Sequence, residues 1–429
     1  MRPKHRRDRW TSVLALAVFA VASFATATPS TADPSTPPPR PDTGQLGGDG
    51  PCSVPANLET AGPYVSNDPN LLHVGQRVWT IQPSGSGSPR TGGSCGDSHR
   101  PVVMFNHGWP VLDLLAMPSK PSFYANTIRN LVSDGNIVVF ANYDWDDPIN
   151  FVDWTHPLQD LVDVRTNIWD GFVQAATYRS ARMKLSDIGI WGHSLGGGVS
   201  PELAKQVWNR GWGRTSFWLA LDAPGDAYYR CSPTITNPFI PPSPAAYDYA
   251  GNCTDITFPT AMAARLRVLV TSYRGDLPSI HLMSWRVYVD MTNLPAGHKW
   301  GVVVNNDCSH TPAGGACANE DCYSDTYPCF AMPPPWLTAF GATSAGPIDC
   351  PQEAPDCRVG HLTATIYKDY PISLEDLRDE NHQNYYGVYR NLQALSDCAR
   401  LGGASCTVDR SSMGTWSDGV PATPAEVLS

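Results

Sequence analysis

The stretch Asp187-Ile188-Gly189-Ile190-Trp191-Gly192-His193-Ser194-Leu195-Gly196 decides the fold. Its first five residues form a short apolar run, which is typical of a buried strand. Residues 195–208 can form a helix, so Ser194 lies at a strand-to-helix turn. Gly192 and Gly196 indicate a turn so tight that a side chain at either position would clash. The positive end of the helix dipole would then face Ser194, where negative charge develops during acyl transfer.

A second match to the pattern G-x-S-x-G, Gly92-Gly93-Ser94-Cys95-Gly96, serves as an internal comparison. It lies in residues 84–98, a stretch rich in Gly, Ser and Pro. No apolar strand precedes this second match and no helical pattern follows it, so the motif has none of its required context. We therefore interpret Ser94 as a loop residue and Ser194 as the candidate nucleophile.

The first residues have the pattern of an export signal. A basic start precedes the apolar run 13–25, which is shorter than the roughly 20 residues of a membrane span. Small residues at 30–32 suit cleavage, so we predict a signal peptide over 1–32 and a secreted protein without a transmembrane anchor. Arg6-Arg7 leaves open whether export follows the general or the twin-arginine route.

The chain has 12 cysteines, and all of them lie outside the predicted signal. In an oxidising compartment this even number predicts up to six disulfides, and Cys231 and Cys253 are candidates for pairing with each other. The competing interpretation is zinc binding by Cys308, Cys317, Cys322 and Cys329. Their spacing is irregular and the chain has no C-x-x-C pair, so we expect no metal site.

The charge of the mature chain is strongly acidic. The predicted signal holds five basic residues and one acidic residue, so its removal takes the formal net charge from −10 to −14. Such a surface argues against nucleic acid and anionic membranes as partners. We expect a small-molecule or polymeric substrate instead.

Residues 51–310 alternate strand and helix patterns, which predicts a mostly parallel central sheet with helices on both faces. We predict strands at 76–81, 101–106, 136–143, 187–191, 215–221, 266–271 and 298–305, and helices at 122–133, 157–180 and 195–208. Residues 279–291 fit either a strand or a helix. The Pro-rich residues 33–50 are expected to be a disordered linker.

Two segments do not follow this alternation. Residues 223–264, rich in Pro and aromatic side chains, are expected to form a lid-like cap over the site. Residues 311–429 are expected to form a disulfide-rich C-terminal extension with a helix within 374–395. This extension and the adjoining Cys308 hold eight of the 12 cysteines.

A serine between strand and helix, within such an alternation, resembles the nucleophile elbow of the α/β-hydrolase fold. A serine hydroxyl needs a base, and the base needs an acid, and this fold carries them in the order Ser, Asp or Glu, His. Asp276 follows the strand at 266–271 and is the candidate acid. Asp222, after the strand at 215–221, is the alternative.

The candidate base depends on how residues 279–291 fold. If they form a helix, the last strand ends near residue 305 and His310 lies in the loop after it. If they contain the last strand, His298 takes that place. We favour His310 because two parallel strands need a long connection, which is usually a helix.

The oxyanion of an acyl-transfer intermediate needs two main-chain donors. The N–H of Leu195, directly after the serine, is the first. The second is predicted to be the N–H of Trp109, in the loop Asn106-His107-Gly108-Trp109 after the strand at 101–106.

Residues 100–310 together resemble the α/β-hydrolase superfamily, and within it the secreted bacterial serine esterases, lipases and cutinase-like polyester hydrolases. The resemblance implies cleavage of a lipid, acyl ester or polyester through an acyl-enzyme, without metal or organic cofactor. The long insertion and the Cys-rich extension are absent from compact polyester hydrolases. A serine amidase or exopeptidase, or a non-catalytic binding protein of the same fold, remains the alternative.

Overall fold

The computed structural model describes residues 38–61, 64–65, 77–108, 121–142, 157–179, 181–224, 255–273, 284, 286–304, 383–417 and 419–428. Nine strands in these ranges form one sheet in the order β1-β2-β4-β3-β5-β6-β7-β8-β9. The strands are β1 Tyr64–Val65, β2 Arg77–Ile81, β3 Arg100–Asn106, β4 Ile137–Ala141, β5 Met183–His193, β6 Ser216–Asp222, β7 Arg267–Tyr273, β8 Lys299–Val304 and β9 Glu426–Leu428.

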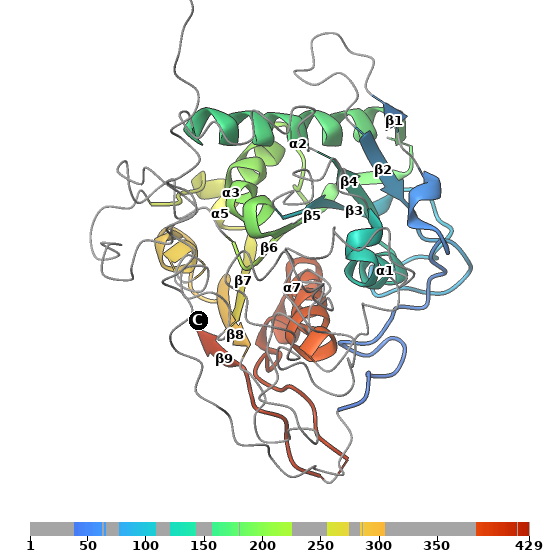
Figure 1. The fold of residues 1–429 in the computed structure, drawn as a ribbon, viewed down its shortest axis with the longest axis vertical. Coiled ribbons are helices and arrows are strands. Elements are labelled where there is room, and N and C mark those ends of the chain that lie inside the picture. Colours follow the sequence, from blue (N-terminus) through green and yellow to red (C-terminus); the bar gives the residue numbers. More distant parts are fainter. Residues whose placement is uncertain are drawn as a thin grey trace, which may run out of the picture.

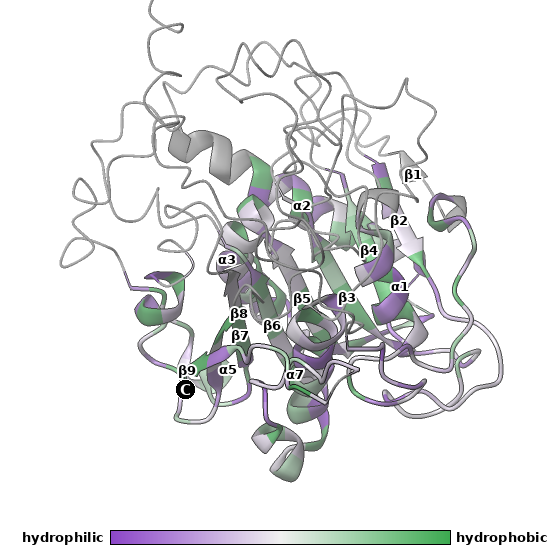
Figure 2. Ribbon diagram, turned by 60° about the horizontal axis from the view of Figure 1, so that its bottom comes forward, coloured by the Kyte–Doolittle hydropathy of each residue, from purple (hydrophilic) through white to green (hydrophobic). Residues whose placement is uncertain are grey.

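The strands from β4 to β8 in this order run parallel. Antiparallel pairs, β1 with β2, β2 with β4, and β8 with β9, lie at the two sides of the sheet. Among the parallel strands, β3, β4 and β6 are buried along their whole length, as expected where both faces of the sheet are covered. Figure 2 shows this as mostly green strands in the middle of the sheet.

Helices cover both faces of the sheet (Figure 1). One face packs against α2 Pro157–Arg179, α3 Ser194–Asn209 and α5 Thr260–Ala263, with Ile168, Leu203 and Met262 among the buried contacts. The other face packs against α1 Ala125–Ser133 and α7 Arg390–Leu401. The short helices η1 Leu58–Ala61, η3 Pro121–Tyr124, the π-helical η9 Gln383–Tyr389 and η10 Gly403–Thr407 complete the described elements.

Most of the predicted elements are confirmed within one to four residues at their ends. The residue after α1, Asp134, is followed by Gly135 at φ +90°, so a glycine ends this helix as expected. Residues 286–290 are helical, which settles the ambiguous segment 279–291 in favour of a helix before the last parallel strand. The strand after that helix is β8.

The expected linker 33–50 is wrong for its described part, residues 38–50. The N–H of Gly47 donates to Gln393 Oε1 over 2.6 Å, and the carbonyl of Gly48 accepts from Asn130 Nδ2 and from Gln393 Nε2. This segment therefore lies against both α1 and α7. Gly50 allows the main chain to approach the end of α1, because a Cβ there would overlap the carbonyl group of Ser133.

Residues 383–428, within the predicted C-terminal extension 311–429, pack on the central sheet in the described structure. Leu392 and Leu395 of α7 are buried against the sheet, and β9 pairs with β8. The apolar spacing of α7 was visible, but a helix pattern does not reveal which domain it packs on. Residues 311–382 lie outside the described residues.

The expected lid, 223–264, lies largely outside the described residues, which resume at 255. Within the described end, Ile256 and Phe258 are buried in the main core rather than placed in a cap.

Two disulfides are described, Cys52–Cys95 and Cys398–Cys406, and no described cysteine is free. Cys231, Cys253 and the four cysteines considered for zinc lie outside the described ranges. Within those ranges no helix has the length and apolar character to cross a bilayer.

Candidate active site

Ser194 lies in a strained turn between β5 and α3. His193, the last residue of β5, is extended, at φ −108° and ψ 138°. Ser194 has φ +49°, a value that costs free energy in any residue with a side chain. A chain keeps such strain only where the surrounding structure enforces it, and strained residues cluster at functional sites.

The glycines around Ser194 are required by close packing. A Cβ at Gly192 would lie within 3.0 Å of Ser200 Oγ and of two main-chain atoms of α3. A Cβ at Gly196 would lie equally close to the carbonyl oxygens of Asn106 and His107. The prediction that neither position tolerates a side chain is therefore confirmed, and the loop after β3 is identified as the neighbour of Gly196.

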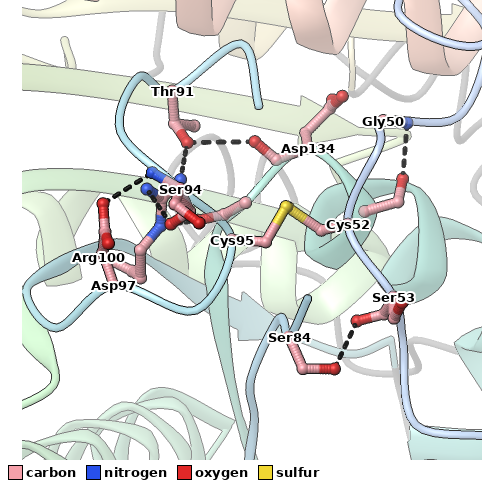
Figure 3. Close-up of a disulfide and its surroundings, with 12 residues drawn as sticks. Gly50, Cys52, Ser53, Ser84, Thr91, Ser94, Cys95, Asp97, Arg100 and Asp134 are labelled. Carbon is pink, nitrogen blue, oxygen red and sulfur yellow. Dashed lines mark hydrogen bonds between the residues drawn. A yellow bond between two sulfur atoms is a disulfide. The ribbon is translucent and has the colours of Figure 1, made fainter. Parts of the chain in front are cut away.

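Ser94 has none of these features, as expected. It lies in a loop whose neighbour Cys95 is joined to Cys52, and its N–H donates to Asp97 Oδ2 over 2.6 Å (Figure 3). Arg100 donates to the carbonyls of Gly92 and Ser94. This second G-x-S-x-G match is thus a disulfide-linked loop.

The loop after β3 is bonded to the first turn of α3. The N–H of Gly196 donates to the carbonyl of His107 over 3.1 Å. The side-chain amide of Asn106 donates to Ser200 Oγ over 2.8 Å, and Ser200 Oγ donates to the carbonyl of Gly196. The loop proposed to hold the second oxyanion donor therefore starts at a fixed distance from Ser194.

His107 is a fully buried histidine in this loop. Burial lowers the pKa of its imidazole to about 3, although the nearby Gly108 carbonyl acts in the opposite direction. The ring is therefore neutral at any physiological pH, and its Nδ1–H donates to the Gly108 carbonyl over 2.7 Å. It stacks on Phe140 with ring centroids 5.2 Å apart, so it is a packing group of the loop and not a proton carrier.

Tyr124 joins the same loop to the residue before the serine. The N–H of Gly108 donates to Tyr124 Oη over 2.8 Å, and Tyr124 Oη lies 3.0 Å from His193 Nδ1. Sequence reasoning missed both side chains, because Tyr124 lies within the predicted helix 122–133 and His193 precedes Ser194, against the order Ser, Asp, His. No sequence signal connects residues 69 positions apart.

Asp222, the alternative acid, lies at the same edge of the sheet as Ser194. It ends β6, is 2% exposed, and pairs in register with His193. The next residue, Ala223, has φ +44° and donates its N–H to the Thr271 carbonyl over 2.9 Å. The carboxyl edge thus carries a second strained turn beside that of Ser194.

His298, the alternative base, lies at the opposite edge. It directly precedes β8, and its Nδ1 is 2.6 Å from Arg267 Nη1 at the start of β7. Since β5 and β8 run in the same direction, the start of β8 and the end of β5 are at opposite edges of the sheet. Burial and the charge of Arg267 lower the pKa of His298. The structure does not bring His298 and Ser194 together.

Three predicted site residues, Trp109, Asp276 and His310, lie outside the described residues. Their positions in the chain follow the ends of β3, β7 and β8, by three, three and six residues. Leu195 is described and is the second residue of α3. In the described ranges no group of three or more His, Cys, Asp or Glu side chains is arranged to hold a metal ion.

Comparison with known proteins gives structural likeness only. No protein-family model and no curated protein matches the chain. Among solved structures, an esterase from Pyrobaculum calidifontis is 15% identical, with a TM-score of 0.35 over 54% of this chain and 72% of that one. Carboxyl esterase 2 from Tuber melanosporum is 14% identical, with a TM-score of 0.36 over 60% and 80%.

The fold rests on the topology of the chain itself. The sheet is mostly parallel, with the strand order β1-β2-β4-β3-β5-β6-β7-β8 and with β2 antiparallel. The strained Ser194 lies between β5 and α3. A sharp turn from strand to helix with serine at its apex is where α/β-hydrolases carry their nucleophile. The chain therefore has the α/β-hydrolase fold, with Ser194 at the elbow of that fold.

Proposed function

We propose that the protein is a secreted serine hydrolase that cleaves carboxylic esters through an acyl-enzyme. The observation that carries the proposal is the left-handed φ of +49° at Ser194 between β5 and α3. The second G-x-S-x-G match lacks this strain, because Ser94 lies in a loop and has no positive φ. The strained turn places the half-buried Ser194 at the carboxyl edge of the sheet, where the substrates of this fold bind.

In the proposed mechanism, Ser194 Oγ attacks the ester carbonyl while His310 accepts its proton. Asp276 orients the imidazole and stabilises its charged form. The N–H groups of Leu195 and Trp109 stabilise the oxyanion, and each such donor is typically worth about 10² to 10³ in rate. His310 then protonates the leaving alcohol, and water activated by the same imidazole releases the acid.

The positions of these partners in the chain support the proposal. Asp276 and His310 follow β7 and β8, whose carboxyl ends lie on the same edge as Ser194. A helix at 286–290 before β8 favours His310 over His298, as does the location of His298 beside Arg267. Asp222 at the end of β6 is the alternative acid.

The substrate is proposed to be a lipid, a small acyl ester or a polyester, bound without metal or cofactor. A serine amidase or exopeptidase would use the same groups with a different pocket. Comparing matched ester and amide substrates separates the two: turnover of the amide at a comparable rate would overturn the assignment as an esterase.

The nucleophile is tested with a fluorophosphonate probe on the full secreted protein, followed by mass mapping of the adduct. We expect labelling at Ser194 that is lost in Ser194→Ala and kept in Ser94→Ala, which changes the serine of the second G-x-S-x-G match. Folded wild-type protein that takes no label and cleaves no ester would overturn the proposal. Because a protonated imidazole cannot accept the serine proton, activity must also fall in acid.

A further inference from the structure

The hydroxyl of Tyr124 lies between the two segments that the proposed reaction must hold together. It accepts from the N–H of Gly108 over 2.8 Å and lies 3.0 Å from His193 Nδ1. Tyr124 belongs to neither segment: it ends η3 and precedes α1, while Gly108 follows β3 and His193 ends β5. One side chain from a third element therefore bridges the loop and the elbow.

The valence of the hydroxyl allows it to bond both neighbours at once. A hydroxyl has one hydrogen and two lone pairs. The Gly108 N–H occupies one lone pair, which leaves the hydrogen and the second lone pair available for the contact with His193 Nδ1. The main-chain N–H, the hydroxyl and the imidazole thus form one hydrogen-bonded chain, in which each bond strengthens the next.

Packing fixes the position of this hydroxyl. Tyr124 is 8% exposed, and its ring contacts Phe105 and Trp191 at centroid distances of 5.3 and 5.8 Å. Gly108 also lies very close to His193, because a Cβ on Gly108 would be 2.6 Å from His193 Nδ1 and 3.2 Å from Tyr124 Oη. The loop, the tyrosine and the histidine therefore have one arrangement rather than several.

We propose that Tyr124 is a positioning residue that holds the main chain at Gly108, directly before the proposed oxyanion donor, against the turn at Ser194. The inference rests on the proposed function. Gly108 directly precedes Trp109, the proposed donor, and His193 directly precedes Ser194. The bond from Gly196 N–H to the His107 carbonyl holds the start of the loop, and Tyr124 holds the loop one residue further on. Without the hydroxyl, the Gly108 amide has no partner there and the loop is free to move.

The test is Tyr124→Phe in the full protein, which removes the hydroxyl and keeps the ring. Displacing an oxyanion donor by a fraction of an ångström affects the transition state more than the bound ester. We expect kcat to fall roughly tenfold to a hundredfold with KM nearly unchanged. The rate of inactivation by the fluorophosphonate, which forms a tetrahedral adduct, should fall by a similar factor.

Tyr386→Phe is the matched control. Its hydroxyl is likewise bonded to the main chain, but it donates to the carbonyl of Pro39 over 3.1 Å, in the segment packed on α7. We expect this variant to keep wild-type kcat. Both variants should shift the unfolding midpoint by similar amounts, so that a loss confined to Tyr124→Phe reports positioning rather than stability.

A second pair of variants probes the other end of the bridge and keeps the test valid if Tyr124→Phe fails to fold. His193→Asn retains an acceptor at the position of Nδ1, whereas His193→Leu does not. We expect His193→Asn to recover most of the kcat that His193→Leu loses. In Tyr124→Phe/His193→Leu the losses should not add, because both remove the same hydrogen bond.

The experiments distinguish a failure of the proposed function from a failure of the positioning role of Tyr124. If wild-type protein neither cleaves esters nor takes the fluorophosphonate, the proposed function is wrong. If wild-type protein is active and Tyr124→Phe retains its kcat, the positioning role is wrong while the function stands. Equal losses in His193→Asn and His193→Leu would also overturn the role of Tyr124.

Discussion

The main-chain N–H of Gly196 donates to the carbonyl oxygen of His107 over 3.1 Å, which joins the nucleophile turn to the loop after β3. The bond needs the two backbones in direct contact, and only glycine at 196 permits that approach. The turn at Ser194 and the loop after β3 are therefore held in one arrangement by main-chain groups. Most side-chain substitutions leave these groups in place.

Gly196→Ala should disrupt this contact. Its Cβ would meet the carbonyl oxygens of Asn106 and His107, and backbone atoms cannot move aside as the end of a flexible side chain can. Such overpacking typically costs about 1 to 3 kcal/mol. We expect esterase activity to fall at least about tenfold as the loop is pushed away. Denaturant unfolding and steady-state kinetics measure the two effects.

Gly96→Ala is the matched control for this change, because Gly96 holds the equivalent position in the second G-x-S-x-G match. A Cβ there would meet only the carbonyl of Gly85, at 3.1 Å. We expect a small loss of stability and full activity. Full activity in Gly196→Ala as well would show that the loop position is not set by this contact.

The two histidines weighed as the base should differ sharply on substitution. His310→Gln removes the proposed proton acceptor, and we expect kcat to fall by at least about a thousandfold, as removal of a member of such a triad does. His298→Gln should keep activity, because His298 lies beside Arg267 at the amino edge and Gln still accepts from that guanidinium. Kinetics on both purified variants decide the assignment. The reverse result, loss only in His298→Gln, would contradict the assignment of His310 as the base.

The fold was accessible from the sequence because the strands have short continuous apolar runs and the serine turn has its glycines in place. Most residues of β3, β4 and β6 are apolar, and this composition predicts that both faces of these strands are buried. Chain order excluded the histidines before Ser194, and the position relative to the last strand then favoured His310 or His298. The structure supports the reason for preferring His310, since residues 286–290 before β8 are helical and His298 lies at the start of β8.

The parts that could not be predicted depend on contacts between distant residues. The packing of residues 38–50 on Asn130 and Gln393 joins positions more than 80 apart in the chain. A Pro- and Gly-rich composition is equally typical of a disordered linker and of a segment that packs against the core. The contact between Tyr124 and His193 could not be predicted either, because the local sequence around each residue explains its presence without the other.

The two described disulfides should differ in their effect on stability. Cys52–Cys95 closes a sequence separation of 43, and Cys398–Cys406 one of 8. Loop-closure entropy in the unfolded chain predicts about 4 kcal/mol for the first and about 2.5 kcal/mol for the second. Cys52→Ala/Cys95→Ala should therefore lower the melting temperature more than Cys398→Ala/Cys406→Ala. Differential scanning calorimetry measures both, and an inverted order would show that native packing outweighs the entropy difference.

Asp134 should make the stability of the fold depend on pH. Its carboxyl is buried at the end of α1, and burial raises its pKa to about 7. Arg90, Gln393 and Arg400 act in the opposite direction, while Asp397 raises the pKa further. Arg90 is itself paired with Asp397. The negative end of the α1 dipole also disfavours the charged form of the Asp134 carboxyl.

The sign of the effect follows from proton binding. Between the ordinary pKa of 3.8 and the folded value of about 7, folded protein holds a proton that unfolded protein releases. The contribution of Asp134 to the free energy of unfolding is therefore complete below pH 3.8 and is lost as the pH rises toward 7. The loss approaches about 1.4 kcal/mol for each pH unit.

Asp134→Asn should remove this dependence, because the amide stays neutral at every pH. We expect the variant to match wild type below about pH 4 and to be more stable by roughly 4 kcal/mol at about pH 8, where the full difference between the two pKa values applies. Urea unfolding followed by tryptophan fluorescence at the two pH values measures the difference. Asp42→Asn, at an exposed carboxylate of the 38–50 segment, controls for the change in net charge. Parallel pH profiles for wild type and Asp134→Asn would mean that the carboxylate stays ionised in the fold, with Arg90 and Arg400 outweighing its burial.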